Sequence, residues 1–337
     1  MKKRTRNLAA AAAVLLLAGA GVLAWQQAQK RSETLEASRR DAQTAVEKSE
    51  SEEDAAAETI TYDGVMYRYK EDIRSYLLMG IDKTTAEEKD SAGRSGQADT
   101  ITLLVRDEEE KKFQILEIPR DTMTQIEAYD AQGKSLGMTE DHINIQYAYG
   151  DGRGSSCRLM MEAVSSLLYQ VPIHGYCAMM MDGISVLNDA VEGVTITVPQ
   201  EGFTFEGQQY EPGTDVKLSG AMAEAFVRYR DTDESLSSLK RMENQNVFLE
   251  AWMRQAQEAA SNDAGFAARL YTALEPYLVT DMANDLFANL LEDASGFEKE
   301  KQMLPGIGST GENFDEYHVD ENALYELVLD MFYEEVK

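Results

Sequence analysis

The chain contains an uninterrupted apolar run, Tyr76–Ile81 (YLLMGI), that has the length of a strand and no polar side. Such runs are typical of strands that are buried on both faces of a sheet. Other short apolar runs follow, and between them lie segments whose apolar residues recur at helical spacing. Short strands mixed with amphipathic helices in one order predict an α/β domain built in layers.

The other elements follow from the same patterns. We expect strands at Tyr76–Ile81, Thr100–Arg106, Phe113–Ile118, Tyr176–Met181 and Val194–Val198. We expect helices at Ser156–Tyr169, Ile184–Val191, Gly220–Tyr229 and Leu239–Gln257. Ser219 is a suitable N-cap for the third helix, and Ser155 or Ser156 for the first. The folded domain is therefore expected over residues 62–257, with Met179–Met181 in the core of a strand.

The N-terminus has the pattern of a membrane segment. Met1–Asn7 carries four basic residues, and Leu8–Trp25 is an uncharged run of mainly Ala, Leu, Val and Gly. This pattern predicts a cytoplasmic tail over residues 1–7, a transmembrane helix over residues 8–25 and a main domain outside the cell membrane. The alternative is a cleaved signal peptide, with a cleavage site near Ala20–Ala24. We favour the anchor, because the apolar part of a signal peptide usually spans only ~7–15 residues.

Two further segments flank the expected domain. Residues 26–61 are rich in charge, and Gln26–Thr59 has no aromatic residue, Gly or Pro. Such a segment cannot bury enough apolar surface to offset its ordering entropy, so we interpret it as a solvated extracytoplasmic stalk. Residues 258–337 carry two apolar stripes at helical spacing around a Gly-rich turn. We expect a helical C-terminal extension docked on the domain, with a partner-binding role as the alternative.

The charge balance excludes one class of partner. The chain has 60 acidic and 32 basic residues and a net charge of −28. So acidic a chain repels polyanions, which excludes nucleic acid, and a phosphate ligand would need a local cluster of Arg. Cys157 and Cys177 could form a disulfide outside the cell or remain two unpaired core residues. The three histidines show no metal-ligand spacing.

Arginine side chains follow a strand and a helix at places suited to anion binding. Ile115–Thr122 (ILEIPRDT) alternates like a strand until Pro119, which cannot donate to a neighbouring strand, so Arg120 should project from the strand end. Arg228 and Arg230 follow the C-terminal turn of an expected helix, where the helix dipole favours cations. That dipole would explain one arginine. Two, together with Arg120, would form a lining suited to pyrophosphate, because guanidinium groups bind phosphate oxygens in pairs.

Carboxylates lie beside two of the expected strands. Asp82 directly follows YLLMGI, and Asp99 directly precedes the next strand. Together they could hold Mg²⁺, which binds one or two carboxylates and completes its shell with water and substrate phosphate. In a chain with 60 acidic residues, either one alone could equally be a surface carboxylate. In a later helix, Arg241 and Gln245 share a face with aromatic residues, which fits the wall of a pocket or a surface helix with a polar end.

The order of these motifs resembles a known family. The resemblance rests on the segments YLLMGID, QADTITLL, ILEIPRDTMTQI, NIQYAYGDG, LLYQVPIHGYCAM, DAVEGVTITVP, LSGAMAEAFVRYRDTD and KRMENQ, within Tyr76–Trp252. In this order they resemble the LytR-CpsA-Psr family of bacterial envelope proteins. The short basic N-terminus, the single anchor and the external domain are similar to the family layout. IPRDT followed by RYRD is the most specific part.

The resemblance implies a fold and an activity. The implied fold is a three-layer α/β/α domain, with a mixed central sheet flanked by helices and a long apolar groove for a polyprenyl chain. The implied activity is that of a membrane-anchored phosphotransferase, which moves a glycopolymer from an undecaprenyl pyrophosphate carrier to a peptidoglycan hydroxyl in cell wall assembly. The implied residues are Asp82 and Asp99 for Mg²⁺, Asp99, Arg120, Arg228 and Arg230 for catalysis, and Arg120, Arg228, Arg230, Arg241 and Gln245 for substrate binding. Asp99 could instead be the base that deprotonates the acceptor.

The chain departs from the family pattern at two places. Where the family has RSDT, this chain has QADT, so that one pyrophosphate-binding Arg becomes Gln97, and Arg94 could replace it only if the loop allows. An acidic residue and a second Arg of the following helix become Ser238 and Asn244. Two hypotheses therefore remain: an active transferase, or a non-catalytic envelope protein that binds a polyprenyl phosphate or glycopolymer and has a regulatory role.

Overall fold

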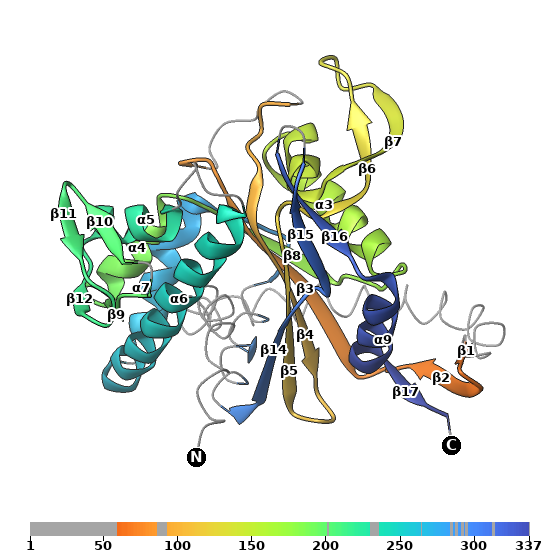
Figure 1. Ribbon diagram of the computed structural model, residues 1–337. Coiled ribbons are helices and arrows are strands. Elements are labelled where there is room, and N and C mark those ends of the chain that lie inside the picture. The colour runs from red at the N-terminus through yellow and green to blue at the C-terminus, as the bar shows by residue number, and fades with distance from the viewer. Residues whose placement is uncertain are drawn as a thin grey trace, which may run out of the picture.

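The computed structural model describes residues 59–85, 93–200, 202–229, 236–263, 265–283, 296–311 and 314–336, with a few single residues between 286 and 293 (Figure 1). The predicted cytoplasmic tail, the transmembrane helix and nearly all of the stalk lie outside the described residues. Within the described ranges, no helix is both long enough and apolar enough to span a membrane.

Six strands form the central sheet. In spatial order they are β13 (Leu278–Thr280), β8 (Gly175–Met180), β3 (Ile73–Ile81), β4 (Ala98–Asp107), β5 (Lys112–Ile118) and β14 (Glu298–Met303). The sheet is mixed, because β3 pairs in parallel with β8 and β5 with β14, whereas the other neighbours are antiparallel. The apolar run Tyr76–Ile81 lies in β3, between β8 and β4.

Helices cover both faces of this sheet (Figure 1). One side carries α4 (Gly183–Ala190), α5 (Gly220–Arg228), α6 (Ser237–Asn262) and α7 (Phe266–Leu274), and the other carries the 3-10 helix η1 (Ile143–Tyr149), α3 (Gly154–Leu167) and α9 (Glu321–Phe332). Leu77 and Leu78 of β3 enter different core clusters, because successive side chains of a strand point to opposite faces. The predicted three-layer arrangement with a mixed central sheet is confirmed.

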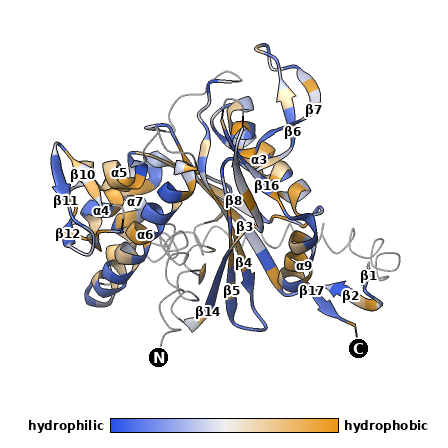
Figure 2. Ribbon diagram, viewed as in Figure 1, coloured by the Kyte–Doolittle hydropathy of each residue, from blue (hydrophilic) through white to orange (hydrophobic). Residues whose placement is uncertain are grey.

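The expected helices and strands are present, with ends shifted by a few residues. The Ser219 side chain caps α5 by accepting a hydrogen bond from the backbone N–H of Met222. The prediction for α3 is corrected: this helix begins at Gly154, and Asp151 accepts hydrogen bonds from the N–H groups of Arg153 and Ser155. Figure 2 shows hydrophobic and hydrophilic residues side by side along α6, as expected for a helix with one buried face.

The C-terminal region differs most from the prediction. Residues 258–337 contain α7, α9 and the short 3-10 helix η2 (Glu275–Tyr277), but also β13, β14 and β17 (Tyr333–Glu335). Strands β13 and β14 form the two edges of the central sheet, so the sheet crosses the domain boundary expected at residue 257. The β14 sequence, EKEKQM, lacks the apolar alternation that predicts a strand, because edge strands tolerate charges and do not need that alternation.

Short paired strands surround the three layers, and β17 also pairs with one of them, β2. The pairs are β1 (Thr59–Tyr62) with β2 (Val65–Tyr69), β6 (Met123–Tyr129) with β7 (Ser135–His142), β9 (Thr195–Thr197) with β12 (Asp215–Lys217), β10 (Phe203–Phe205) with β11 (Gln208–Tyr210), and β15 (Gly306–Thr310) with β16 (Asp315–Val319). The Gly-rich segment expected as a turn between two helices is thus the hairpin β15–β16. It adjoins the IPRDT motif, because the N–H of Tyr317 donates to the carbonyl oxygen of Asp121.

Candidate active site

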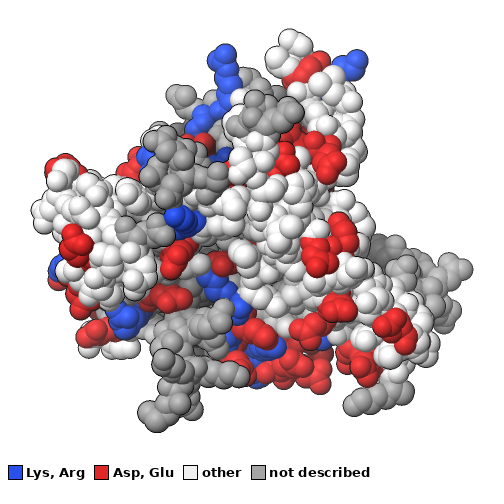
Figure 3. All heavy atoms as spheres, in the orientation of Figure 1, with Lys and Arg blue, Asp and Glu red and all other residues white. Residues whose placement is uncertain are grey.

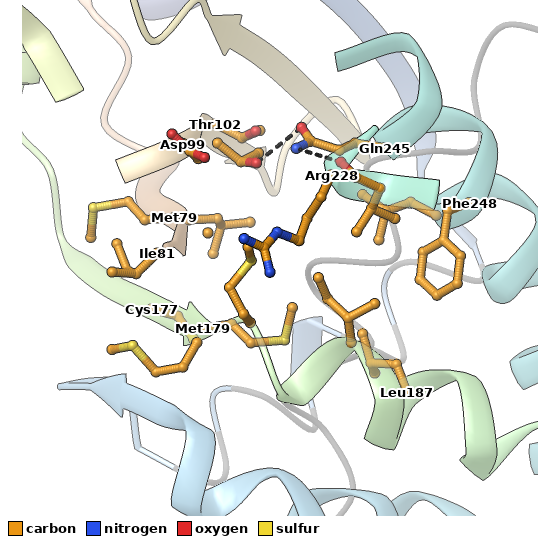
Figure 4. A pocket seen from close by; sticks show the side chains of 18 of the residues that line it. Met79, Ile81, Asp99, Thr102, Cys177, Met179, Leu187, Arg228, Gln245 and Phe248 are labelled. Atoms are coloured by element: carbon orange, nitrogen blue, oxygen red, sulfur yellow. Dashed lines mark hydrogen bonds between the residues drawn. The ribbon is translucent and has the colours of Figure 1, made fainter. Parts of the chain in front are cut away.

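An apolar pocket lies between the central sheet and helices α4, α5 and α6. Its space, including the open mouth, is about 970 Å³. The apolar lining consists of Leu78, Met79, Ile81, Met179, Met180, Met181, Ile184, Leu187, Val227, Phe248, Leu249 and Leu278. Met179–Met181, expected only as strand core, therefore also form part of a cavity wall. The polar lining residues are Asp99, Thr100, Thr102, Arg228, Arg241 and Gln245, so an anionic head group and an apolar chain could be held together (Figure 4).

A β-bulge directs Asp99 toward this pocket. Gly80 of β3 pairs with Thr100, but the next residue, Ile81, pairs with Ala98, so Asp99 is the extra residue of β4. Bulges commonly occur next to active sites, where they redirect a side chain. The Asp99 carboxylate and the Thr100 hydroxyl consequently both line the pocket. The sequence placed Asp99 just before the strand, whereas the structure places it inside the strand, at this irregularity.

Two guanidinium groups hold the Asp99 carboxylate. Nη1 of Arg120 donates to Oδ1 of Asp99, and Nη1 of Arg241 donates to Oδ2 over 2.8 Å. All three side chains are largely withdrawn from solvent, with exposed fractions of 15% for Asp99, 17% for Arg120 and 8% for Arg241. Asp121 also accepts from Nε of Arg120 over 3.2 Å, so two guanidinium groups and two carboxylates meet in this cluster. The structure thus brings together three residues that the sequence proposed separately.

Gln97 connects this cluster to Asp82. The backbone N–H of Gln97 donates to Oδ1 of Asp82, and the N–H of Asp82 donates to the carbonyl oxygen of Gln97 over 3.1 Å. This contact depends on Gly96, which has φ +84°, and a Cβ at that position would lie 2.8 Å from Oδ1 of Asp82. The Gln97 side chain accepts from Nη2 of Arg120 over 2.8 Å. Gln97, noted from the sequence only as a departure, is therefore part of the site.

Gln245 and Arg228 lie at the polar side of the pocket. Oε1 of Gln245 accepts from the Thr100 hydroxyl over 3.0 Å, which joins α6 to β4. Figure 4 shows Arg228 extending from the end of α5 across the pocket toward Met179. Its side chain is 57% exposed and forms an ion pair with Glu224 over 2.8 Å. Arg228 thus lies at the pocket without joining the cluster around Asp99, and Arg230 lies outside the described residues.

The predicted Mg²⁺ ligands differ in how well they suit a metal. Asp82 is exposed and directs one carboxylate oxygen to the Gln97 backbone. Asp99 has both oxygens in ion pairs with arginine. Mg²⁺ needs oxygen ligands from the protein and fills its shell with water and phosphate, so Asp82 fits as a ligand, and Asp99 does not while both arginines hold it. The described residues contain no cluster of three His, Cys, Asp or Glu suited to a metal.

The positions that depart from the family pattern are accounted for in part. Arg94 is exposed, and Gln97 rather than Arg94 contacts Arg120. Ser238 is buried near the start of α6, and the Asn244 side chain lies 3.5 Å from the carbonyl oxygen of Tyr229. Of the two alternatives for the cysteines, the structure shows the second, since Cys157 and Cys177 are both free and buried.

Comparison with known proteins identifies the family. A model of the LytR_cpsA_psr family matches residues 26–331. The chain belongs to the LytR-CpsA-Psr family. The prediction made from the motif order is confirmed, and the match extends well beyond Tyr76–Trp252 in both directions.

Several LytR-CpsA-Psr relatives carry an enzymatic name. The chain is 30% identical to the polyisoprenyl-teichoic acid–peptidoglycan teichoic acid transferase TagU of Halalkalibacterium halodurans, over 69% of each chain. It is 25% identical to the protein of the same name from Bacillus subtilis, over 78% of each chain. The prediction of a transferase is confirmed at this level.

Solved structures of the family share the fold. The crystal structure of B. subtilis TagV superposes with a TM-score of 0.58 and 23% identity, covering 78% of this chain and 98% of that chain. The structure of TagT bound to LI-WTA gives a TM-score of 0.56 and 20% identity, covering 77% of this chain and 90% of that chain. These likenesses confirm the mixed α/β architecture.

Proposed function

We propose that this LytR-CpsA-Psr protein is a membrane-anchored phosphotransferase that moves a glycopolymer from an undecaprenyl pyrophosphate carrier to peptidoglycan. The observation that carries the proposal is the Asp99 carboxylate between Arg120 and Arg241, at the polar side of an apolar pocket. The names of the TagU relatives supply the donor and acceptor classes, a polyisoprenyl-linked teichoic acid and peptidoglycan.

The pocket suits a ligand with an apolar chain and an anionic head. The methionines, leucines and isoleucines of the lining offer contact to a hydrocarbon but no hydrogen bonds. Arg228 and Arg241, which line the pocket, provide forked donors for phosphate oxygens, and Arg120 adds a third guanidinium beside the lining residue Asp99. Among the charged side chains on the face shown in Figure 3, acidic ones are more common than basic ones. These guanidinium groups would therefore offer local donors for an anion on a chain that otherwise repels anions.

The chemistry required is a single displacement at phosphorus. The acceptor hydroxyl attacks the phosphorus that carries the glycan, and the new O–P bond forms. The bond from that phosphorus to the bridging oxygen breaks, and polyprenyl monophosphate leaves with the electron pair. Arg120 and Arg241 would stabilise the charge on the phosphate oxygens, since phosphoryl transfer depends on positioning and electrostatics more than on covalent catalysis. One good electrostatic donor contributes about 3–4 kcal/mol to such a step.

Asp99 is the candidate base for the acceptor hydroxyl. Phosphate oxygens compete for the guanidinium groups that hold it, so ligand binding would release a carboxylate oxygen to accept the proton. Mg²⁺, when bound by Asp82 and by the phosphates of the substrate, would neutralise part of the developing charge. Residues 8–25 would hold the chain in the membrane, which also contains the carrier lipid.

A reconstituted transfer reaction tests the proposal. The full chain in lipid nanodiscs is incubated with a polyprenyl pyrophosphate-linked glycan and peptidoglycan oligomers, with and without Mg²⁺. We expect Mg²⁺-dependent release of polyprenyl monophosphate together with glycan-bearing peptidoglycan, and loss of both products in Arg120→Ala. Binding of the carrier lipid without any product would instead indicate the non-catalytic envelope protein.

A further inference from the structure

The guanidinium of Arg120 has an acceptor on each of its three nitrogens. Nη1 donates to Asp99, Nε donates to Asp121 over 3.2 Å, and Nη2 donates to Gln97 over 2.8 Å. Asp99 must also serve Arg241, and Asp121 lies next to Arg120 in the chain. Among these three acceptors, Gln97 is the one without a charge, and it lies two residues before Asp99 in the chain.

Gln97 is itself fixed at both ends. Its backbone N–H and carbonyl oxygen both bond to Asp82, at the point where β3 ends. Its side-chain oxygen accepts a second hydrogen bond, from Nδ2 of Asn144 over 3.1 Å. Asn144 is buried, and its backbone N–H donates to the carbonyl oxygen of Arg120 over 3.3 Å. Asn144 thus contacts the Arg120 backbone directly and also contacts the Gln97 amide oxygen, which in turn accepts from the Arg120 side chain.

The donor and acceptor roles in this network follow from Arg120. A guanidinium can only donate, so Gln97 must turn its amide oxygen toward Arg120. Asn144 must then turn its amide nitrogen toward that same oxygen. This orientation leaves Oδ1 of Asn144 buried without a hydrogen-bond partner among the described residues, which is unfavourable for Asn144 alone. The network is therefore organised around Arg120.

We propose that Gln97 is a positioning residue, whose amide oxygen fixes the Arg120 guanidinium in the geometry that grips the pyrophosphate. This inference rests on the proposed function for the identity of the ligand and adds a role for a residue that would not touch the reacting atoms. Gln97 also ties Arg120 to Asp82, so that the guanidinium and the candidate Mg²⁺ carboxylate keep a constant relation.

Two substitutions separate the amide oxygen from the bulk of the side chain. Gln97→Met keeps the length of the side chain and removes the acceptor. Gln97→Glu keeps an acceptor at the same reach and adds a negative charge. Since a hydrogen bond to a charged group is involved, we expect Gln97→Met to lower kcat roughly tenfold. We expect Gln97→Glu to keep kcat within about threefold of the unchanged protein and to raise KM, because its charge repels phosphate. Equal losses of kcat in both variants would overturn the proposal.

A double-mutant cycle with Arg120 tests whether Gln97 acts through that residue. The affinity of the full chain in nanodiscs for farnesyl pyrophosphate is measured by calorimetry for Gln97→Met, Arg120→Ala and the double variant. We expect Gln97→Met to weaken binding roughly tenfold alone and to have no further effect beside Arg120→Ala. Additive losses, or no loss in the single variant, would refute the positioning role. Coupling in this cycle without any glycan transfer would support the inference and count against the proposed function.

Discussion

Arg241 donates from Nη1 to Oδ2 of Asp99 over 2.8 Å, although 142 positions separate the two residues in the chain. The contact joins the first buried turns of α6 to the bulge in β4. Arg120 contacts the other carboxylate oxygen, so two positive charges share the Asp99 carboxylate. That carboxylate offsets the repulsion between the two guanidinium groups. Stability and ligand binding at this site are therefore opposed.

Asp99→Asn should reveal this opposition. Removing the charge of Asp99 takes the shared carboxylate from Arg120 and Arg241 in a poorly hydrated site and leaves Asp121 as the acid beside Arg120, so we expect the free energy of unfolding to fall by about 2–3 kcal/mol. Inorganic pyrophosphate should raise the melting temperature of the variant more than that of the unchanged protein, because it replaces the missing charge. Asp263→Asn, which removes an exposed ion pair with Arg269, is the matched control and should cost less than about 1 kcal/mol. Equal destabilisation in both variants would contradict the expectation.

Met179→Trp should block the apolar pocket. The larger ring would exclude two or three methylene groups of a bound chain, each worth about 0.8 kcal/mol, so we expect polyprenyl monophosphate affinity to fall at least tenfold. The affinity for inorganic pyrophosphate should fall much less, since the Asp99 cluster with Arg120 and Arg241 is untouched and only the exposed Arg228 extends toward Met179. Met138→Trp on the exposed face of β7 is the control and should leave both affinities unaltered. Isothermal titration measures all of them, and equal losses for both ligands would argue against a lipid in this pocket.

Gly96→Ala should damage the site in two ways. The positive φ of +84° disfavours any side chain by about 1–2 kcal/mol, and the new Cβ would meet the Asp82 carboxylate. Gly64→Ala is a close control, with φ +80° and no atom near the added Cβ. We expect both variants to lose stability in urea denaturation, and only Gly96→Ala to lose Mg²⁺-dependent activity. Loss of that activity in Gly64→Ala would show that backbone strain alone explains the effect.

The stability of the domain should depend on His174 at mildly acidic pH. Nδ1 of His174 accepts from the backbone N–H of Ser75 over 3.1 Å, and partial burial together with the Arg74 charge lowers its pKa. The unfolded chain therefore binds this proton at a higher pH than the folded chain does. The contribution of His174 is complete above an ordinary pKa of about 6.5 and is lost as the pH falls below it. His174→Asn offers an acceptor that does not titrate, so its stability relative to the unchanged protein should improve from pH 7.5 to pH 5.0. Parallel curves in urea denaturation would contradict this assignment.

A chain that ends at residue 257 should not fold. It lacks both edge strands of the central sheet and the buried face of α9, including Leu324, Met331 and Phe332. We expect aggregation and loss of cooperative unfolding, as measured by size exclusion and circular dichroism. A chain that ends at Glu335 keeps every strand and should unfold like the full chain. A cooperative transition in the shorter chain would mean that the region beyond residue 257 is dispensable.

The sequence allowed the layers and most site residues to be predicted because those features are local or ordered along the chain. The composition of YLLMGI, which is entirely apolar, indicates a strand that is buried on both faces. Ser219 is a residue type that is preferred at helix N-caps. The IPRDT motif located Arg120 at a strand end, where it is found. These inferences needed no knowledge of partners distant in the sequence.

Features that depend on distant partners escaped prediction. The bulge at Asp99 is defined by the register in which β4 pairs with β3, and no residue type in the sequence predicts that register. From the sequence, Gln97 indicates only the loss of a pyrophosphate-binding Arg. The structure shows that Arg120 and Asn144 both donate to its amide oxygen. Strand β14 carries the pattern of a solvated segment because only its pairing with β5 makes it a strand. A polar residue that replaces an expected Arg, next to a Gly with room for no side chain, is the signal that could have pointed to Gln97.

The pairing of β14 with β5 sets an order on biogenesis. Strand β5 pairs with a strand that is synthesised after every helix of the α4–α7 side, and such distant pairings form slowly. If the domain is exported in the N-to-C direction, the site around Asp99 would face the exterior with one flank of its sheet still open. Chaperones or the translocation machinery would then have to shield that flank until β14, Glu298–Met303, emerges.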